Sequence, residues 1–435
     1  MIETLRLPAN HVDRQVLNDE VHARPPMELT APCRLSYLAL ASEGVSRRAQ
    51  QAPILAFARF YGIDPPAEEA NHYAVDVGGF RLKWERHTEF CRYTVAAPGI
   101  EGSPFETPAL ALLPKDWLAS LPGRTVVASH AAMLGPGQLG DDYDVISDRY
   151  FRGEMLIGAK IAGGQGVALT DLRIRSDGFS RFLIENDAMT TWQAGRLMQR
   201  LFEIDTYRMM ALLTLPVARR LTPTLSASEE ELAEITSAMA AAGEADEPAL
   251  LDRLTRLEAA IETTHSTSHY RFTAANAYHA LVQRRIEELR EERIEGLQTF
   301  KEFTERRLAP AMDTCRAVAA RQAALSERVA RAVSLLSTRV DVARQRQNHE
   351  VLAAMNKRAA VQLRLQETVE GLSIAAVTYY IVGLISYASK GLTSFGISVN
   401  PTLVVALSIP VVLVLVALGL SNVRRMIPFL RRDDE

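Results

Sequence analysis

The sequence has few cysteines and no excess of positive charge, and each shortage excludes a class of protein. Its three cysteines, Cys33, Cys91 and Cys315, lie far apart and match no metal-ligand spacing. We therefore expect reduced thiols, with neither a disulfide framework nor a zinc site. The net charge of −3 and the pI near 6.4 argue against a nucleic-acid partner, because neutralising phosphates requires a concentrated basic surface.

Motifs that carry chemistry are also scarce. The sequence contains no Gly-x-Ser-x-Gly elbow, no HExxH and no thioredoxin-like cysteine pair. The glycines of 153–166 suggest a phosphate loop, but Lys160 follows no glycine and precedes no Ser or Thr, so a tight turn between strands is favoured. His265 and His269 have the i, i+4 spacing of two metal ligands on a helix, yet without a third ligand an ordinary polar face is favoured. We expect no enzyme, and the sequence indicates no particular cofactor.

Charged side chains are absent from two apolar runs near the C-terminus, 372–389 and 402–420. Each run has about the minimum length of a helix that crosses 30 Å of hydrocarbon, so we predict a transmembrane hairpin in the lipid bilayer. The loop 390–401 carries only Lys390, whereas arginines precede the first run and fill the tail 421–435. By the positive-inside bias, both ends are expected in the cytoplasm and the loop outside. The N-terminus lacks a signal-peptide pattern, so residues before the hairpin are expected to form a cytosolic body.

Residues 1–185 hold most of the turn signals and are expected to form an α+β (α/β-like) cytosolic domain. Helices are predicted over 47–61 and 114–121. The predicted strands are 34–40, 80–85, 90–95, 125–128 and 167–174.

Residues 186–310 form a helical region in which strand signals stop. We expect a helix of about 28 residues that begins near Asp187 and ends at Pro216. The capping-box spacing of 228–231 predicts that a second, acidic helix starts there. After a pause at 243–248, one helix is predicted over 249–307, with Pro310 as the next break.

Residues 311–389 contain no proline, so one helix of about 79 residues can run from a stalk, 311–371, into the first apolar run. Its apolar stripe includes Leu325, Val329 and Leu336. Such a helix needs a partner, and we expect a helical bundle or coiled coil, within one chain or between copies in a homo-oligomer.

Four peptides carry a resemblance to a known family. They are residues 18–26 (NDEVHARPP), 83–90 (KWERHTEF), 170–182 (TDLRIRSDGFSRF) and 200–210 (RLFEIDTYRMM). With them, nearly the whole chain resembles an uncharacterised family of bacterial membrane-anchored proteins, the domain of unknown function 3422. The resemblance implies a protein of the bacterial inner (cytoplasmic) membrane, and it implies no activity and no catalytic residues.

The first two of these peptides are rich in charge. The second reads as a strand and the first as an extended, proline-limited segment, so their side chains could converge. A structural ion-pair network is favoured over a ligand site, and a histidine beside carboxylates could also sense pH. The candidate cluster is Glu20, His22, Arg24, Arg86, His87 and Glu89.

Polar side chains lie on one side of the first apolar run. Ser373, Tyr379, Tyr380, Gly383, Ser386, Tyr387 and Lys390 fall on one arc of about 140° at 100° per residue, and we call this surface the polar arc. Because a polar surface in lipid needs protein or water, the first helix is expected to face inward and the second outward in an oligomer. Alternatively, these side chains only join a dimer.

The layout resembles that of the CorA-type magnesium channels, although their Gly-Met-Asn signature is absent and the nearest match is 395–400 (FGISVN). The resemblance therefore does not extend to magnesium selectivity. Our first hypothesis is a homo-oligomeric channel or transporter for an ion, with divalent cations as the candidate ions. The alternative is a membrane-anchored scaffold or sensor that binds a protein or small ligand through its cytosolic domain. The pore candidates are Tyr380, Gly383, Ser386 and Tyr387, with Asn400 near the mouth.

Overall fold

The computed structural model describes residues 8–22, 25–394 and 400–426, with the side chains of 20–22, 393–394 and 420–426 left aside. The chain divides into two compact units. The first unit comprises Met1–Ala241 and Ala249–Val333, and the second comprises Ala242–Pro248 and Ser334–Glu435. Strands lie in the first unit, and helices make up most of the rest, so the α+β class is confirmed.

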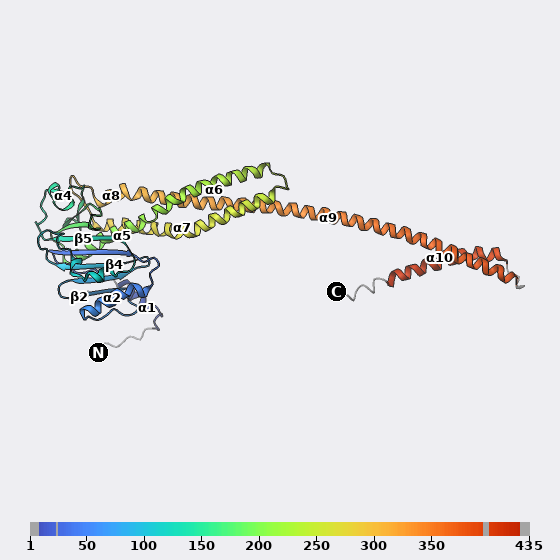
Figure 1. Cartoon of the computed structure of the whole chain (residues 1–435), viewed down its shortest axis with the longest axis horizontal. Coiled ribbons are helices and arrows are strands. Elements are labelled where there is room, and N and C mark those ends of the chain that lie inside the picture. The colour runs from blue at the N-terminus through green and yellow to red at the C-terminus, as the bar shows by residue number, and fades with distance from the viewer. Residues whose placement is uncertain (1–7, 23–24, 395–399, 427–435) are drawn as a thin grey trace. The chain divides into compact units, whose positions relative to one another are not determined.

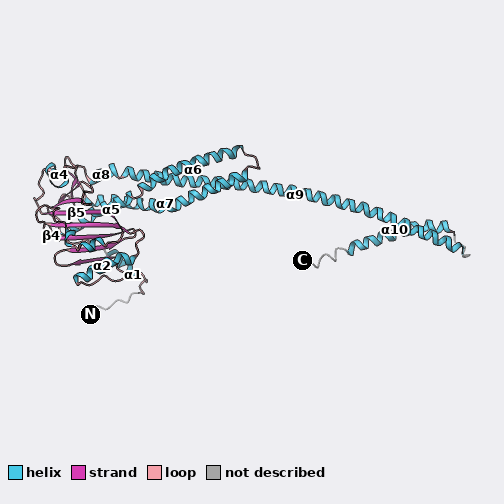
Figure 2. Ribbon diagram, viewed as in Figure 1, coloured by secondary structure: helices cyan, strands magenta, loops and turns pink. Residues whose placement is uncertain are grey.

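A nine-stranded mixed sheet forms the centre of the first unit (Figures 1 and 2). Its strand order is β2-β3-β4-β1-β5-β8-β7-β6-β9. The β5–β8 pair is parallel, and the other neighbouring pairs are antiparallel. The strands are β1 Cys33–Ala41, β2 His72–Asp76, β3 Arg81–Arg86, β4 Phe90–Pro98, β5 Arg124–Leu134, β6 Ile157–Ile161, β7 Gly166–Thr170, β8 Ser180–Asn186 and β9 Glu292–Arg293.

One face of the sheet is covered by helix α2 (Arg47–Tyr61), the 3-10 turn η1 (Ala109–Leu112) and α3 (Lys115–Ala119). Leu82, Trp84 and Tyr93 pack there against Ile54 and Phe57 of α2. The predicted helix 47–61 is confirmed. It begins at its Ser46 cap and ends at Gly62, which has a φ of 65°.

The opposite face is covered by α5 (Thr191–Leu212), which starts at a capping box of Thr190 and Gln193. Tyr37 of β1 stacks on Phe202 of α5, with ring centroids 4.5 Å apart and planes at 8°. The side chains of 82–85 are therefore all buried, alternately toward each helical layer. Helix α4 (Tyr143–Phe151) contributes Ile146 and Phe151 to a second apolar cluster with Leu169 and Leu183.

The strand predictions are confirmed in four of five places. The segments 34–40, 80–85, 90–95 and 125–128 lie in or overlap β1, β3, β4 and β5. The fifth, 167–174, is too long, because β7 ends at Thr170 and Leu172 turns the chain with a φ of 50°. Strands β2, β6, β8 and β9 were not predicted.

The breaks predicted near Pro216 and Pro310 are confirmed, but the prediction that a helix starts at 228–231 is wrong. Helix α5 ends at Leu212, and α6 (Leu215–Ala241) begins directly before Pro216, since the first turn of a helix accepts proline. The spacing of 228–231 lies inside α6 and starts no helix. Pro310 likewise lies in the first turn of α9 (Ala309–Ser394), directly after a helix that ends at Arg307, as predicted.

The predicted helix 249–307 is interrupted. Helix α7 (Glu247–Leu289) ends where Arg290 adopts a φ of 50°. The chain then pairs briefly with the sheet as β9 before α8 (Phe300–Arg307) starts at a capping box of Thr299 and Glu302. The predicted pause at 243–248 is confirmed, since α6 ends at Ala241 and α7 begins at Glu247.

Helices α6, α7 and the start of α9 pack together in the first unit. Arg321 of α9 donates from Nε to Glu229 Oε1 of α6 over 2.7 Å, and Ser268 Oγ of α7 donates to Gln322 Oε1 of α9 over 3.2 Å. This packing provides the partner that the apolar stripe requires. The buried positions include Leu225, Leu232 and Ile235 of α6, Leu254, Leu257 and Ile261 of α7, and Val318, Leu325 and Val329 of α9.

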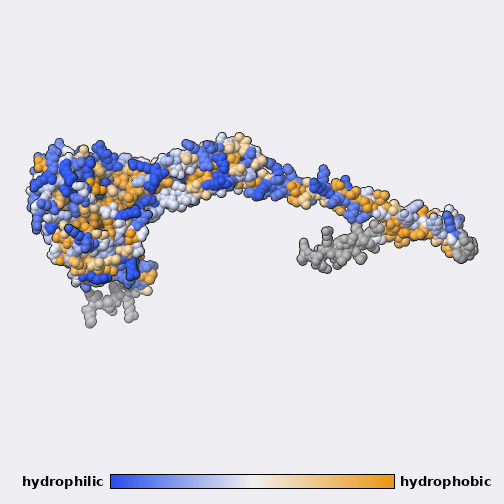
Figure 3. All heavy atoms as spheres, viewed as in Figure 1, coloured by the Kyte–Doolittle hydropathy of each residue, from blue (hydrophilic) through white to orange (hydrophobic). Residues whose placement is uncertain are grey.

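The second unit contains the rest of α9, the α6–α7 turn and α10 (Pro401–Met426). Arg339 and Arg346 of α9 pair with Glu247 and Glu244 at the turn, over 3.8 and 2.6 Å. Beyond these pairs the side chains of 347–369 are exposed. Two stretches are long and apolar enough to cross a membrane by length and composition, one within Phe300–Leu392 and one at Pro401–Gly419. Figure 3 shows their apolar surface in orange.

Candidate functional site

The candidate residues Arg86, His87 and Glu89 lie together at the turn between β3 and β4. The backbone N–H of His87 donates to Phe90 O over 2.8 Å and closes this turn. Arg86 donates from Nε and Nη2 to Asn71 Oδ1 over 3.1 and 2.8 Å. Glu89 instead pairs with Arg271 of α7, with 2.7 Å between Nη1 and Oε1. The turn therefore contacts a loop on one side and a helix on the other.

The remaining candidates of this cluster lie on or beside helix α1 (Arg14–His22). The expectation of an extended segment is corrected here, because the chain is helical up to His22. The side chains of Glu20 and His22, and Arg24 as a whole, lie outside the described residues. Met27 and Leu29, which follow in the sequence, lie between the sheet and α5 and line a small cavity there.

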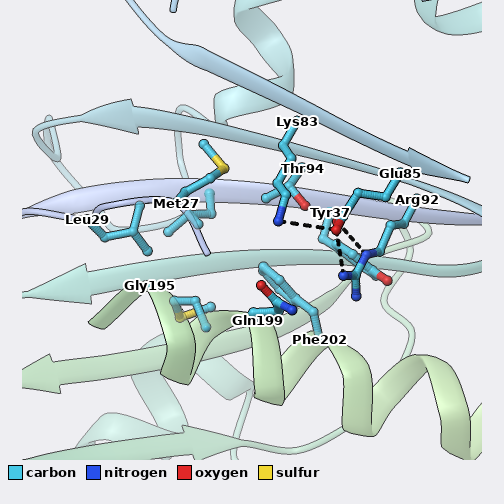
Figure 4. A pocket seen from close by; sticks show the side chains of 12 residues that line it. Met27, Leu29, Tyr37, Lys83, Glu85, Arg92, Thr94, Gly195, Gln199 and Phe202 are labelled. Carbon is cyan, nitrogen blue, oxygen red and sulfur yellow. Dashed lines mark hydrogen bonds and ion pairs between the residues drawn. The ribbon is translucent and has the colours of Figure 1, made fainter. Parts of the chain in front are cut away.

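A chain of charges, which sequence reasoning missed, crosses from the sheet to the helices, and Figure 4 shows its members on the sheet, Lys83, Glu85 and Arg92. Lys83 Nζ lies 3.2 Å from Glu85 Oε1, and Arg92 binds Glu85 through Nε and Nη2 over 2.5 and 2.9 Å. Arg92 Nη1 also donates to Glu203 Oε1 of α5 over 3.0 Å. Glu203 in turn accepts from Arg285 Nε of α7 over 2.5 Å. Charges of opposite sign thus alternate along the whole chain of contacts.

Burial and charge oppose each other within this chain of contacts. Burial raises the pKa of Glu85, but the neighbouring Arg92 guanidinium outweighs it, and the pKa of Glu85 falls to about 2. The pKa of Glu203 is lowered for the same reason, with burial opposing and Arg92 and Arg285 prevailing. Burial lowers the pKa of Lys83. Both carboxyl groups are therefore ionised at neutral pH, and each has a cationic partner.

The segment after α1 lies over this network. Lys83 Nζ donates to Pro25 O over 2.7 Å, and the backbone N–H of Leu29 donates to Thr191 O over 3.1 Å. A Cβ added to Gly195 of α5 would lie 1.7 Å from Met27 O, so only glycine fits there. The cavity of about 30 Å³ beside Lys83 and Glu85 (Figure 4) has room for about one or two waters.

Two larger hollows adjoin the β3–β4 turn and share Thr88. The first, of about 600 Å³, lies between the turn and helices α5 and α7, and its lining includes Arg86, His87, Tyr207 and Tyr278. The second, of about 750 Å³, lies beside the Glu89–Arg271 pair and the start of α6. The first hollow is lined by Asn71, Arg86, His87, Thr88, Phe90, Tyr207, Tyr278 and Leu281.

The glycines and histidines noted in the sequence lie in a hairpin turn and on helix α7. The glycines of 163–166 form the hairpin turn between β6 and β7, as predicted. The rings of His265 and His269 lie 5.0 Å apart. Within the described ranges, no group of three or more His, Cys, Asp or Glu side chains could hold a metal ion.

The pore candidates lie on the second unit. Thr378 and Ser389 of α9 and Val412 of α10 are buried, and Figure 1 draws α10 beside the end of α9. Because side chains on an isolated helix stay exposed, these three positions mark the faces at which the two helices meet. Thr378 and Ser389 are eleven residues apart, which places them within about 20° of each other on α9.

The polar arc points away from this contact. Its centre lies about 150° around α9 from Thr378, and Tyr380 and Tyr387 are 72% and 77% exposed. Gly383 and Ser386 are half-buried. Asn400 caps α10, because its Oδ1 accepts from the backbone N–H of Thr402 over 3.2 Å. In one chain, the tyrosines of the polar arc are therefore exposed, whereas Gly383 and Ser386 are partly covered.

A family model described as "Protein of unknown function (DUF3422)" matches residues 9–427. No curated protein matches the chain. The match covers the sheet, the helices and both apolar stretches.

Proposed function

We propose that this chain, which belongs to the DUF3422 family of proteins of unknown function, is an integral protein of the bacterial inner membrane that forms a homo-oligomeric ion channel or transporter. The stretch 372–389 of α9 and helix α10 cross the bilayer, and both termini lie in the cytoplasm. The layout resembles that of the CorA-type channels, with a sheet domain, a helical hairpin, a stalk helix and two spans. Several copies surround one axis, with α9 inside.

The orientation of α9 supports this proposal most directly. The centre of its polar arc turns away from α10, whose exposed side chains are mostly Leu, Val and Ile. A polar surface inside a bilayer requires protein or water beside it. In an oligomer with α9 toward a common axis and α10 toward lipid, the polar arc of α9 faces water and the apolar side chains of α10 face lipid. Hydroxyl groups of Tyr380, Ser386 and Tyr387 then line the path, with Asn400 near its outer mouth.

The test is ion flux into vesicles that contain the purified full-length protein. The ions are magnesium, cobalt, zinc and potassium. Gly383→Leu and Ser386→Leu should reduce flux by at least about tenfold, because apolar constrictions close a water path by dewetting. Gly419→Leu and Ser408→Leu are the matched controls on α10. They should leave flux unchanged, because α10 faces lipid in this proposal. The glycine pair is well matched, since neither added Cβ would meet an atom within 4 Å.

Absence of flux for every ion, or equal loss in both pairs of variants, would refute the channel. The second candidate function would then remain, in which the hairpin only anchors a cytosolic scaffold or sensor. A specific observation favours it as well, namely the hollows of about 600 and 750 Å³ at the β3–β4 turn. Their volumes lie in the range of small-molecule sites.

A further inference from the structure

The hollow of about 600 Å³ has an aromatic floor. His87 stacks on Phe90 with ring centroids 4.5 Å apart and planes at 23°. Tyr207 of α5 stacks on Tyr278 of α7 at 5.7 Å and 26°. Phe90 joins the two pairs, since its ring lies 6.4 Å from Tyr207 and 6.5 Å from Tyr278. Phe90 and Tyr207 are buried, so the half-buried rings of His87 and Tyr278 offer the planar faces on which another ring can stack.

A positively charged group stands at the edge of this floor. Arg86 is held by Asn71, which accepts from its side chain and, through its backbone carbonyl, from its backbone N–H over 2.7 Å. In the part of the chain that the structure describes, no carboxylate forms an ion pair with Arg86, whereas Arg271 nearby is neutralised by Glu89. The residues that line the hollow include no Asp or Glu. Its fixed charge is therefore positive.

We propose that this hollow binds a small molecule that combines a planar aromatic ring with an anionic group, of the nucleotide or aromatic carboxylate class. The ring stacks on the floor, and the anion binds the guanidinium of Arg86, whose planar fork suits phosphate and carboxylate oxygens. The volume suits one such molecule. The proposal rests on the sensor candidate and names its ligand class, and it is independent of ion conduction.

Equilibrium binding to the full-length protein in detergent tests the proposal. The probes are AMP and 2-naphthoate, which carry a ring and a charge, adenosine, which has the ring alone, and inorganic phosphate, which has the charge alone. AMP or 2-naphthoate should bind about tenfold more tightly than adenosine and than phosphate, because a charge-assisted hydrogen bond adds to stacking. AMP and 2-naphthoate together distinguish the two ligand classes.

Variants then locate the site. Arg86→Gln should weaken binding by about tenfold or more, and Leu281→Trp should abolish it by filling the hollow from α7. Arg284→Gln, at an exposed position on the same helix, is the control and should bind as the parent does. If Arg86→Gln does not fold, Leu281→Trp decides. Equal binding of all four probes, or unchanged binding by the folded variants, would overturn the proposal, whatever the vesicles show about ion flux.

Discussion

At Gly195, helix α5 and the segment after α1 approach so closely that no side chain fits. A Cβ there would lie 1.7 Å from the carbonyl oxygen of Met27, which is backbone and cannot rotate away. Gly195→Ala should therefore displace the segment and lower stability by about 1–3 kcal/mol. The thermal unfolding midpoint of the full-length protein in detergent measures this. Gly79→Ala, with open space around the added Cβ, should leave the midpoint unchanged.

Glu85 should make stability depend on pH in acid. Its folded pKa of about 2 lies below the ordinary 4.5, so the unfolded state binds the proton more readily. Its contribution is fully present above pH 4.5 and is lost as the pH falls toward 2, by about 3 kcal/mol in all. Unfolding by urea across this window should show a steeper pH dependence for the parent than for Glu85→Gln. Equal slopes would mean that Arg92 does not hold this carboxylate.

Burial of these charges could not be predicted from the sequence. Lys83 and Glu85 alternate with Leu82 and Trp84, which is also the pattern of a strand with one face in water. Whether that face meets solvent or a helix depends on α5, more than 100 residues later. Glu203 and Arg285 complete the network. They come from two helices far from β3 in the sequence, so no local pattern predicts that they meet Glu85 and Arg92.

At the scale of elements, local signals predicted well where they were strong. Helix α2 has a Ser46 cap and a terminal Gly62, and its bounds matched. The capping-box spacing of 228–231 failed, because the same residues also suit the interior of a helix once α6 has begun earlier. Strand β9 has two residues, too few to produce any periodicity. Its pairing depends on β6 at the sheet edge.

Helix α9 should not tolerate proline at Leu336, which is buried. Leu336→Pro removes a backbone hydrogen bond and clashes with the preceding turn, at about 3 kcal/mol or more. We expect lower helix content by circular dichroism and loss of assembly by native mass measurement. Leu336→Ala removes the packing and keeps the backbone bonds, so it should assemble. If the proline variant assembles as the parent does, α9 does not act as one helix.

At the scale of the whole molecule, the arginine asymmetry around the apolar stretches predicts the topology. A reporter fused before Met1 and another fused after Glu435 should both report the cytoplasm in bacterial cells. A reporter inserted after Asn400 should report the outside. Both termini outside, with the reporter after Asn400 inside, would reverse the orientation of both spans, and the mouth assigned to Asn400 would then lie on the wrong side. Termini on opposite sides of the membrane would mean that only one of the two stretches crosses it.

In a channel built from several copies, the polar arc of α9 lines a water-filled path that the copies share. Water accessibility tests this directly, without knowledge of the ion, by labelling single cysteines in membranes with a water-soluble maleimide. The native cysteines are buried and are replaced by alanine first. Tyr380→Cys, Gly383→Cys and Tyr387→Cys should be labelled, whereas Leu407→Cys and Leu415→Cys on α10 should not. Labelling of Asn400→Cys alone, with all three arc positions protected, would contradict the account.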